Sequence, residues 1–379
     1  MLDYEILRLV WWALLGVLLI GIAVMDGFDL GSAILLPIVG RSDMERRIVI
    51  NTVGPVWEGN QVWLILGGGA IFAAWPALYA VAFSGFYLAM LLLLLSLILR
   101  PVGFKFRSKL EGTRWRTTWD TALFISGLVP ALVFGVAFGN ALQGVPFRFD
   151  DTLRMTYTGS LFDLFNPFAL LAGLVSVAMI VMHGGAWLAC KTEAPLRRRA
   201  QCAGAISALL LVVLFAVGGV WAAHLDGYVV HSFAGVDAPS NPLMKHVDRA
   251  SGALVANYAA MPLALLAPLI GLGGALLAAL LLAIGRLRVL AFCLSGLSIA
   301  GVVATAGVSL FPFLLPSSLD PNASLLVWDA SSSQTTLLVM TVLTALLLPV
   351  VLLYTAFIYR VLRGPVTAAS IAADPHENY

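Results

Sequence analysis

Nine long apolar segments, separated by short polar loops, make up most of this chain of 379 residues. A helix needs about 20 mainly apolar residues to cross the hydrocarbon core of a bilayer, and it satisfies its own backbone groups there. The pattern therefore predicts an all-α integral membrane protein with about nine transmembrane helices, in one polytopic membrane domain over residues 1–379. The segments are Leu7–Val39, Gln61–Trp75, Ala77–Leu99, Thr121–Leu142, Leu161–Ala189, Ala200–His224, Pro262–Ile284, Val289–Leu315 and Thr335–Leu362.

The composition indicates that lipid, rather than water, is the main solvent. Hydrophobic residues make up 60% of the chain and charged residues only 11%, whereas soluble domains usually carry about 25% charged residues. The net charge of +2 is close to neutral and no block of basic residues stands out. We therefore expect no nucleic-acid partner.

The distribution of lysine and arginine predicts the orientation. Of the 22 basic residues, 17 fall in loops on the side opposite the N-terminus. Cytoplasmic loops carry the excess of basic residues in membrane proteins, so the N-terminus is predicted to be periplasmic and the C-terminus cytoplasmic. The longest outer loop then spans residues 225–261, and a short cytoplasmic tail spans residues 363–379. The five basic residues on the outer side are Arg8, Arg148, Arg154, Lys245 and Arg249.

Small residues indicate where helices can approach closely. The strings GVAFGN at 135–140 and LAGLVS at 171–176 predict close helix contacts. Glycines 67–69 interrupt the second segment, and Pro76 follows it with almost no loop, which suggests a tight helical hairpin. The three cysteines have no CxxC spacing and are interpreted as small core residues; they are Cys190, Cys202 and Cys293.

Four acidic residues lie in or beside the apolar segments, on the side predicted to be cytoplasmic. Asp26 and Asp29 fall inside the first segment at i,i+3 spacing, Glu58 precedes the second and Asp120 opens the fourth. A charged side chain near mid-bilayer costs about 2.5–3.5 kcal/mol on insertion scales. These acids are candidates for a hydrated proton path from the cytoplasm, with Asp120 the weakest. The alternative is structural: the acids cap helices or pair with Arg100 or Arg107.

The histidines do not form a pattern expected of haem ligands. Axial ligands to a b-type haem are His or Met, and His183 is the only histidine that lies well inside an apolar segment. We interpret it as a hydrogen-bonded interior residue, so this chain is expected to ligate no haem or other metal through its own side chains. Two function classes remain: a respiratory subunit whose redox centres lie in a partner, and a proton-coupled secondary transporter.

Longer strings resemble subunit II of cytochrome bd-type quinol oxidases. They are DGFDLG at 26–31, WEGNQVWLILGGGAIFAAWP at 57–76, SGFYLAMLLLLLSLILRPVGFKFRSK at 84–109, GVAFGNALQGVPF at 135–147, LFPFLLPSS at 310–318 and WDASSSQ at 328–334. The resemblance extends over the whole chain. It departs from the family pattern at Glu58, where well-known relatives have Asp, and at Lys105, where some have an acid.

The resemblance implies two four-helix bundles plus a peripheral helix, in a bacterial inner membrane. It implies a partner, subunit I, that carries haem b558, haem b595 and haem d, and a complex that oxidises quinol, reduces dioxygen to water and builds proton-motive force without pumping. It also implies a proton path along Asp26 and Glu58, an oxygen route past Trp63, a structural quinone in some members and, in some complexes, a small single-helix accessory subunit.

Overall fold

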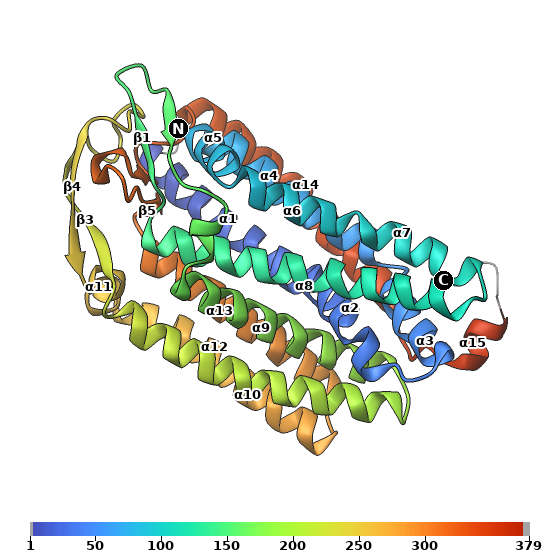
Figure 1. Ribbon diagram of the computed structural model, residues 1–379. Helices are drawn as coiled ribbons and strands as arrows, with labels where there is room; N and C mark the ends of the chain where they lie inside the picture. Colours follow the sequence, from blue (N-terminus) through green and yellow to red (C-terminus); the bar gives the residue numbers. More distant parts are fainter. Residues whose placement is uncertain (1–2, 374–379) are drawn as a thin grey trace.

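The computed structural model describes residues 3–373 and is built almost entirely from helices (Figure 1). The predicted cytoplasmic tail spans residues 363–379, and its part beyond residue 373, which includes His376, lies outside the described residues. The helices are α1 (Tyr4–Met25), α2 (Gly27–Val39), α3 (Asp43–Val53), α4 (Trp57–Ala74), α5 (Pro76–Gly85), α6 (Tyr87–Leu97), α7 (Leu99–Phe106), α8 (Thr113–Gln143), α9 (Pro167–Lys191), α10 (Leu196–Ala222), α11 (Ala253–Ala260), α12 (Leu266–Ile284), α13 (Arg288–Leu310), α14 (Gln334–Val361) and α15 (Ala368–Ala373).

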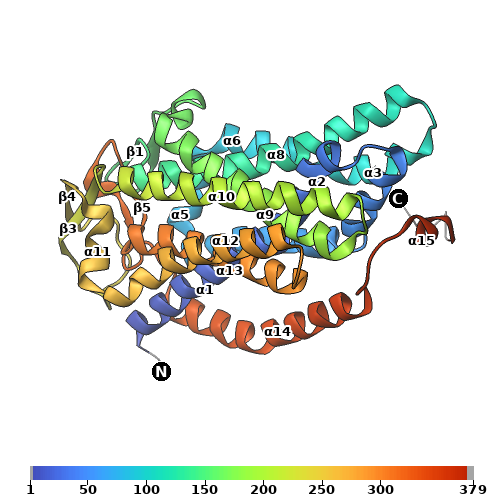
Figure 2. The ribbon, with the colours of Figure 1, turned by 90° about the horizontal axis from the view of Figure 1, so that it is seen from below.

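Two four-helix bundles lie side by side, as the resemblance implied. In the first, the continuous α1–α2 segment packs against α4 and α8, and the α5–α7 segment closes the group against α4 and α8. In the second, α9 packs against α10 and α13, and α12 packs against α10 and α13. Helices α2 and α8 join the bundles through contacts with α9. Helix α14 is the peripheral helix and packs mainly along α1 and α4 at one edge (Figure 2). Near its C-terminal end, Tyr359 reaches Phe28 of α2 and Trp187 of α9.

Eight helical segments within residues 3–373 are long and apolar enough to cross a membrane, with α1 and α2 counted as one. The remaining predicted span, the second in chain order (Gln61–Trp75), corresponds to α4. The first turns of α4 contain Glu58, Asn60 and Gln61, which make the helix too polar to meet that criterion. Its 18 residues still give a length of about 27 Å at 1.5 Å per residue. The chain then turns at Trp75, and α5 begins at Pro76 and packs against α4.

Several predicted ends of spans differ from the ends of the helices; α8, for example, begins at Thr113 rather than Thr121. Two of these differences have a clear local cause. Helix α9 begins at Pro167 rather than near Leu161, because the Asn166 side chain accepts a hydrogen bond from the Ala169 amide and caps the helix there. Helix α13 ends at Leu310, and Phe313–Leu315 forms a short strand, β5. Pro312 explains the second difference, because the residue before a proline is disfavoured in helical conformation.

The small residues permit the contacts predicted for them. A Cβ added to Gly139 of α8 would lie 2.6 Å from the Ala169 Cα of α9, and one added to Gly135 would lie 2.7 Å from the Gly173 Cα. Only glycine allows the two backbones to approach this closely. The interpretation of the cysteines was wrong: Cys202 and Cys293 are exposed on the helix surface, because their positions on α10 and α13 face away from the bundle.

The N-terminal end of the bundles carries the short strands. Strands β3 (Asp226–Phe233) and β4 (Lys245–Ser251) form an antiparallel hairpin in the predicted outer loop, and β1 (Phe147–Phe149), β2 (Met155–Tyr157), β5 and β6 (Leu325–Leu326) form two further pairs.

A buried ion pair anchors the β3–β4 hairpin to the bundle. The Lys245 ammonium lies 2.7 Å from the Asp329 carboxylate, and the Lys245 side chain is fully buried. Burial lowers the pKa of Lys245 and raises the pKa of Asp329, and each charge opposes that effect on the other. The hairpin therefore has one fixed side, facing the bundle.

Candidate functional site

The site centres on Asp26, at the junction where the first predicted span divides into two helices. Helix α1 ends at Met25 and α2 begins at Gly27, yet the Asp26 amide still donates to the Ile22 carbonyl and the Asp26 carbonyl still accepts from the Leu30 amide. The segment therefore stays continuous through the junction. Asp26 is 1% exposed and Asp29 is fully buried, so both carboxyl groups depend on protein partners.

Asp26 pairs with Arg100 of α7. The Arg100 Nη1 atom donates to one carboxylate oxygen at 2.5 Å, and Nη2 approaches the other at 3.4 Å. Arg100 is also fully buried. This is the structural pairing considered from the sequence, and it neutralises one of the two buried acids.

Asp29 is bound by the amide of Asn60 instead of a cation, and a phenol holds that amide in turn. The Asn60 Nδ2 atom donates to Asp29 Oδ2 at 2.8 Å, and the Tyr359 hydroxyl donates to Asn60 Oδ1 at 2.8 Å. The second oxygen, Oδ1, is buried and has no hydrogen-bond partner among the described residues. Asp29 also lies close enough to Asp26 and Arg100 for electrostatic interaction. We call Asp26, Asp29, Arg100, Asn60 and Tyr359 the acid cluster.

Glu58 does not join the acid cluster. Although it lies only two residues before Asn60, it is exposed on the surface of α4, and within the described residues it makes no hydrogen bond or ion pair with Asp26 or Asp29. Residues two apart on a helix point in different directions. The same geometry buries Trp57 and Trp63 on the inner side of α4.

Trp63 packs into a groove on α1 that only glycine provides. A Cβ added to Gly21 would lie 2.7 Å from Trp63 Cζ3. The indole therefore fills the seam between α1 and α4.

Asp120 is held in an ion network at the end of the bundles opposite the strands. Arg107 Nε donates to Asp120 Oδ1 at 2.5 Å, and Arg46 Nη1 donates to Oδ2 at 2.7 Å. Arg107 also contacts Asp43 at 3.0 Å. With both oxygens bound by cations, the geometry favours the structural reading of Asp120, a tie between α3 and α8.

His183 is a bonded interior residue, as interpreted from the sequence. Its Nδ1 atom lies 2.7 Å from the Ser295 hydroxyl, and its Nε2 atom lies 3.1 Å from the Val24 carbonyl. The ring stacks on Phe292 with 4.5 Å between centroids. Both nitrogens are engaged within the chain, so His183 does not fit the role of a haem ligand.

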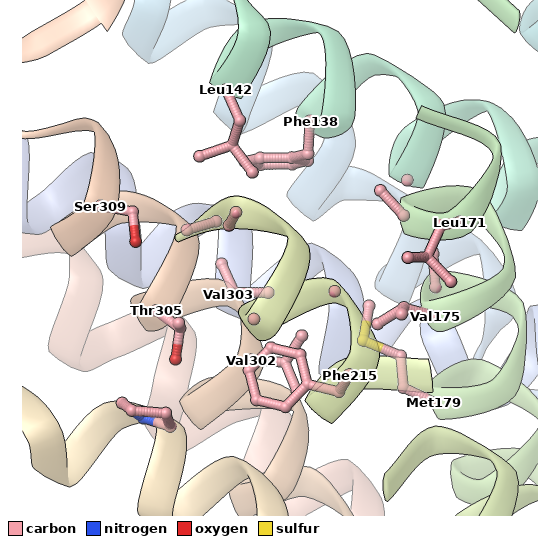
Figure 3. A pocket seen from close by; sticks show the side chains of 18 of the residues that line it. Phe138, Leu142, Leu171, Val175, Met179, Phe215, Val302, Val303, Thr305 and Ser309 are labelled. Atoms are coloured by element: carbon pink, nitrogen blue, oxygen red, sulfur yellow. The ribbon is translucent and has the colours of Figure 1, made fainter. Parts of the chain in front are cut away.

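A cavity of about 420 Å³ lies between the two bundles, lined by residues of α1, α2 and α8 on one side and of α9 to α13 on the other (Figure 3). Most of its wall is aliphatic or aromatic; Phe138, Val175 and Phe215 are examples. Hydroxyl groups gather at one edge, where the Tyr258 hydroxyl lies 3.1 Å from the Ser309 hydroxyl. The cavity suits a long apolar molecule with one polar end.

Comparison with known proteins identifies the family. The profile of cytochrome bd terminal oxidase subunit II matches residues 7–362. The chain is a member of this family. It is 51% identical to "Cytochrome bd-I ubiquinol oxidase subunit 2" of Escherichia coli (strain K12), with 100% of both chains covered. It is 31% identical to "Cytochrome bd ubiquinol oxidase subunit 2" of Bacillus subtilis (strain 168), covering 94% of this chain and 96% of the relative.

A solved structure supports the fold. The bd oxidase from Geobacillus thermodenitrificans matches with a TM-score of 0.63 at 17% identity, covering 94% of this chain and 98% of that one. Membership of the bd oxidase family makes this chain a subunit of a respiratory quinol oxidase in the inner membrane, with a subunit I partner and haem in the complex. The transporter alternative is set aside.

Sequence reasoning found the acids of this bd oxidase subunit but missed their connections. The sequence indicated Arg100 only as one of two alternative partners for the acids, and Tyr359 was not singled out. Tyr359 carried a weak signal, since it is a polar side chain at the end of the last apolar segment. Asn60 follows Glu58 by two residues in the sequence, and it is the residue that joins α4 to Asp29.

Proposed function

We propose that this subunit supports a haem-bearing subunit I and gives cytoplasmic protons access towards its oxygen-reducing centre. Haem b558, haem b595 and haem d are all ligated by the partner in this proposal. The acid cluster is the observation that carries it, because two buried acids with one arginine between them leave one carboxyl group without a cation. An intramembrane acid of this kind is expensive to bury and is commonly functional.

The proposed orientation has the N-terminus in the periplasm and the C-terminus in the cytoplasm. The alternation of the helices supports it, because the loops with the 17 basic residues meet at the end that carries α3 and α15 (Figure 1). Asp26 and Asp29 follow the 22 residues of α1, which starts at the other end. The acid cluster therefore lies towards the side from which protons are consumed.

Within the proposed path, Asp29 is the better candidate for relaying protons and Asp26 for positioning. A carboxyl group relays a proton only if it can change protonation state, and both oxygens of Asp26 face the guanidinium of Arg100 in a buried ion pair. Asp29 has an amide partner and one free oxygen. Asn60 cannot pass a proton through its amide, so the Asn60–Tyr359 link orients Asp29. Glu58, on the chain surface, would serve as an outer acceptor, and Asp120 has the weakest claim to a role.

The subunit assignment is tested by purifying the complex through this chain and recording a reduced-minus-oxidised optical spectrum. We expect haem signals in the complex. We also expect His183→Ala to leave every haem signal unchanged in type, because His183 hydrogen-bonds Ser295 and Val24 instead of iron. Loss of one haem signal from an otherwise intact complex would show that this chain provides a ligand.

An oxygen route past Trp63 is also proposed. The indole fills the α1–α4 seam against Gly21, so Trp63→Ala would open that seam. We expect the rate constant for oxygen binding to rise, with the KM for quinol unchanged. Trp57→Ala is the matched control, since Trp57 packs on Phe104 instead. Equal oxygen kinetics in wild type and Trp63→Ala would exclude a route past this side chain.

We propose that the cavity between the bundles binds a structural quinone. Its volume of 420 Å³ falls within the range of about 300–1,000 Å³ typical of ligand pockets. Val303→Trp should fill it and remove about one quinone per complex from solvent extracts, without changing quinol turnover. Val213→Trp, on the exposed face of α10, is the control. Full quinone content in Val303→Trp would place the quinone elsewhere.

A further inference from the structure

The cavity between the two bundles reaches the surface of the chain on one side. The lining residues from α1, α2, α8, α9 and α13 are buried or only partly exposed. The exposed lining residues all come from the end of α10, from α11 and from the position just before α12; they are Ala216, Gly219, Val220, Val255 and Leu265. The exposed fraction is 66% for Val220, 36% for Val255 and 46% for Leu265. The cavity therefore has an opening between these elements.

The opening exists because α10 and α11 pack on other elements. Helix α10 packs against α9 and α12, whereas α11 packs mainly against α13 and β3. Side chains hold α11 in that place: Asn257 Nδ2 donates to the Val308 carbonyl at 2.8 Å, and the Tyr258 hydroxyl donates to the Thr305 carbonyl at 3.1 Å. Both acceptors belong to α13. The end of α10 is thus left beside α11 with the cavity between them.

A second pocket, open on the outer face of α10, adjoins the cavity at this opening. It is lined by Ala216, Val217, Val220, Trp221 and His224. Ala216 and Val220 line the second pocket and the cavity alike. The Trp221 ring packs edge-on against Phe168 with 5.8 Å between centroids, and Phe168 also lines the cavity. A continuous apolar surface therefore leads from the outside of α10 into the cavity.

The surroundings of the opening are those of a lipid-facing surface. Helix α10 has 27 residues and meets the criterion for a membrane span. It lies on the side of the bundles away from α14 (Figures 1 and 2). Its exposed outer face is apolar; Val213 and Val217, for example, are 58% and 49% exposed. Tryptophan is enriched where a span meets the membrane surface, and Trp221 lies at the end of this one. The opening therefore faces the bilayer at the level of the leaflet edge.

We propose that the opening bounded by Val220, Trp221 and Val255 is a lateral entrance, through which an isoprenoid quinone passes between the bilayer and the cavity. This proposal rests on the proposed quinone site in the cavity. A quinone with a long apolar tail is dissolved in the same layer that the entrance faces, so it reaches the cavity without crossing water. The bound quinone is therefore exchangeable with the quinone of the membrane.

The test measures quinone exchange in the intact oxidase complex. The complex is reconstituted into phospholipid vesicles that contain isotopically labelled ubiquinone, recovered after increasing times, extracted and analysed by mass spectrometry. Val220→Trp places an indole across the entrance and should slow the exchange at least about tenfold, because passage then requires packed side chains to be displaced. The quinone content at the start should equal that of wild type. Trp221→Ala removes one edge of the entrance and should speed the exchange.

Val213→Trp is the matched control. Val213 lies seven residues before Val220, about two turns away on the same face of α10, and it lines neither pocket. This variant should exchange quinone as wild type does. Equal exchange rates in wild type and Val220→Trp would overturn the lateral entrance, as would equal slowing in Val213→Trp. A wild-type complex without bound quinone would instead overturn the quinone site itself, and the entrance with it.

Discussion

Replacing Asp26 with asparagine is expected to destabilise the assembled oxidase before it affects proton transfer. The substitution leaves the Arg100 guanidinium fully buried and without its counter-ion. Removing one partner of a buried ion pair typically costs about 3–5 kcal/mol. The yield of complex from the membrane and its thermal inactivation temperature should both fall.

The double variant Asp26→Asn/Arg100→Gln separates pairing from proton transfer. With both charges removed, no uncompensated charge remains, so yield and inactivation temperature should recover most of the loss. Arg46→Gln is a useful comparison, because Arg46 is partly exposed and Asp120 keeps Arg107 as a partner. If Asp26→Asn assembles and withstands heat as wild type does, the Asp26–Arg100 pair contributes little to stability.

Replacing Asp29 with asparagine should slow turnover without destabilising the assembled complex. Asn keeps the shape of the side chain and a hydrogen bond to Asn60, and no cation depends directly on Asp29. Assembly and haem content should therefore be unchanged. Because the amide cannot accept and release a proton, oxygen consumption should fall by more than about tenfold. Proton uptake after a single oxygen pulse should slow in step with turnover.

Two further variants show whether the carboxyl group itself is responsible. Asp29→Glu restores an ionisable group and should recover part of the rate. Tyr359→Phe removes only the hydrogen bond to Asn60, worth about 1 kcal/mol, and should slow turnover far less than Asp29→Asn. An Asp29→Asn complex that turns over at the wild-type rate would exclude this residue from the proton path and leave the path to subunit I.

The sequence by itself predicted the features that depend on local pattern. Apolar length predicted the spans, because a bilayer demands about 20 apolar residues wherever a helix crosses it. Glycine and alanine spacing predicted the contact of α8 with α9, which Gly135 and Gly139 permit. Errors occurred at the ends of spans. Asn166 caps the start of α9 and Pro312 prevents α13 from continuing, and hydropathy marks neither position as a helix end.

Tertiary structure alone decided which polar groups meet. Asp26 and Asp29 were visible in the sequence as costly intramembrane acids, but Arg100 and Asn60 reach them from helices 74 and 31 residues away. The orientation of α4 about its axis places Asn60 inside the protein and Glu58 on its surface. In the sequence both are polar residues at the start of the same apolar segment. Rotation and partner choice depend on the packing of whole helices. No local pattern in the sequence encodes them. For this reason the sequence did not show that Asp26 forms an ion pair, that Asp29 keeps one oxygen without a partner, or that Glu58 lies on the surface.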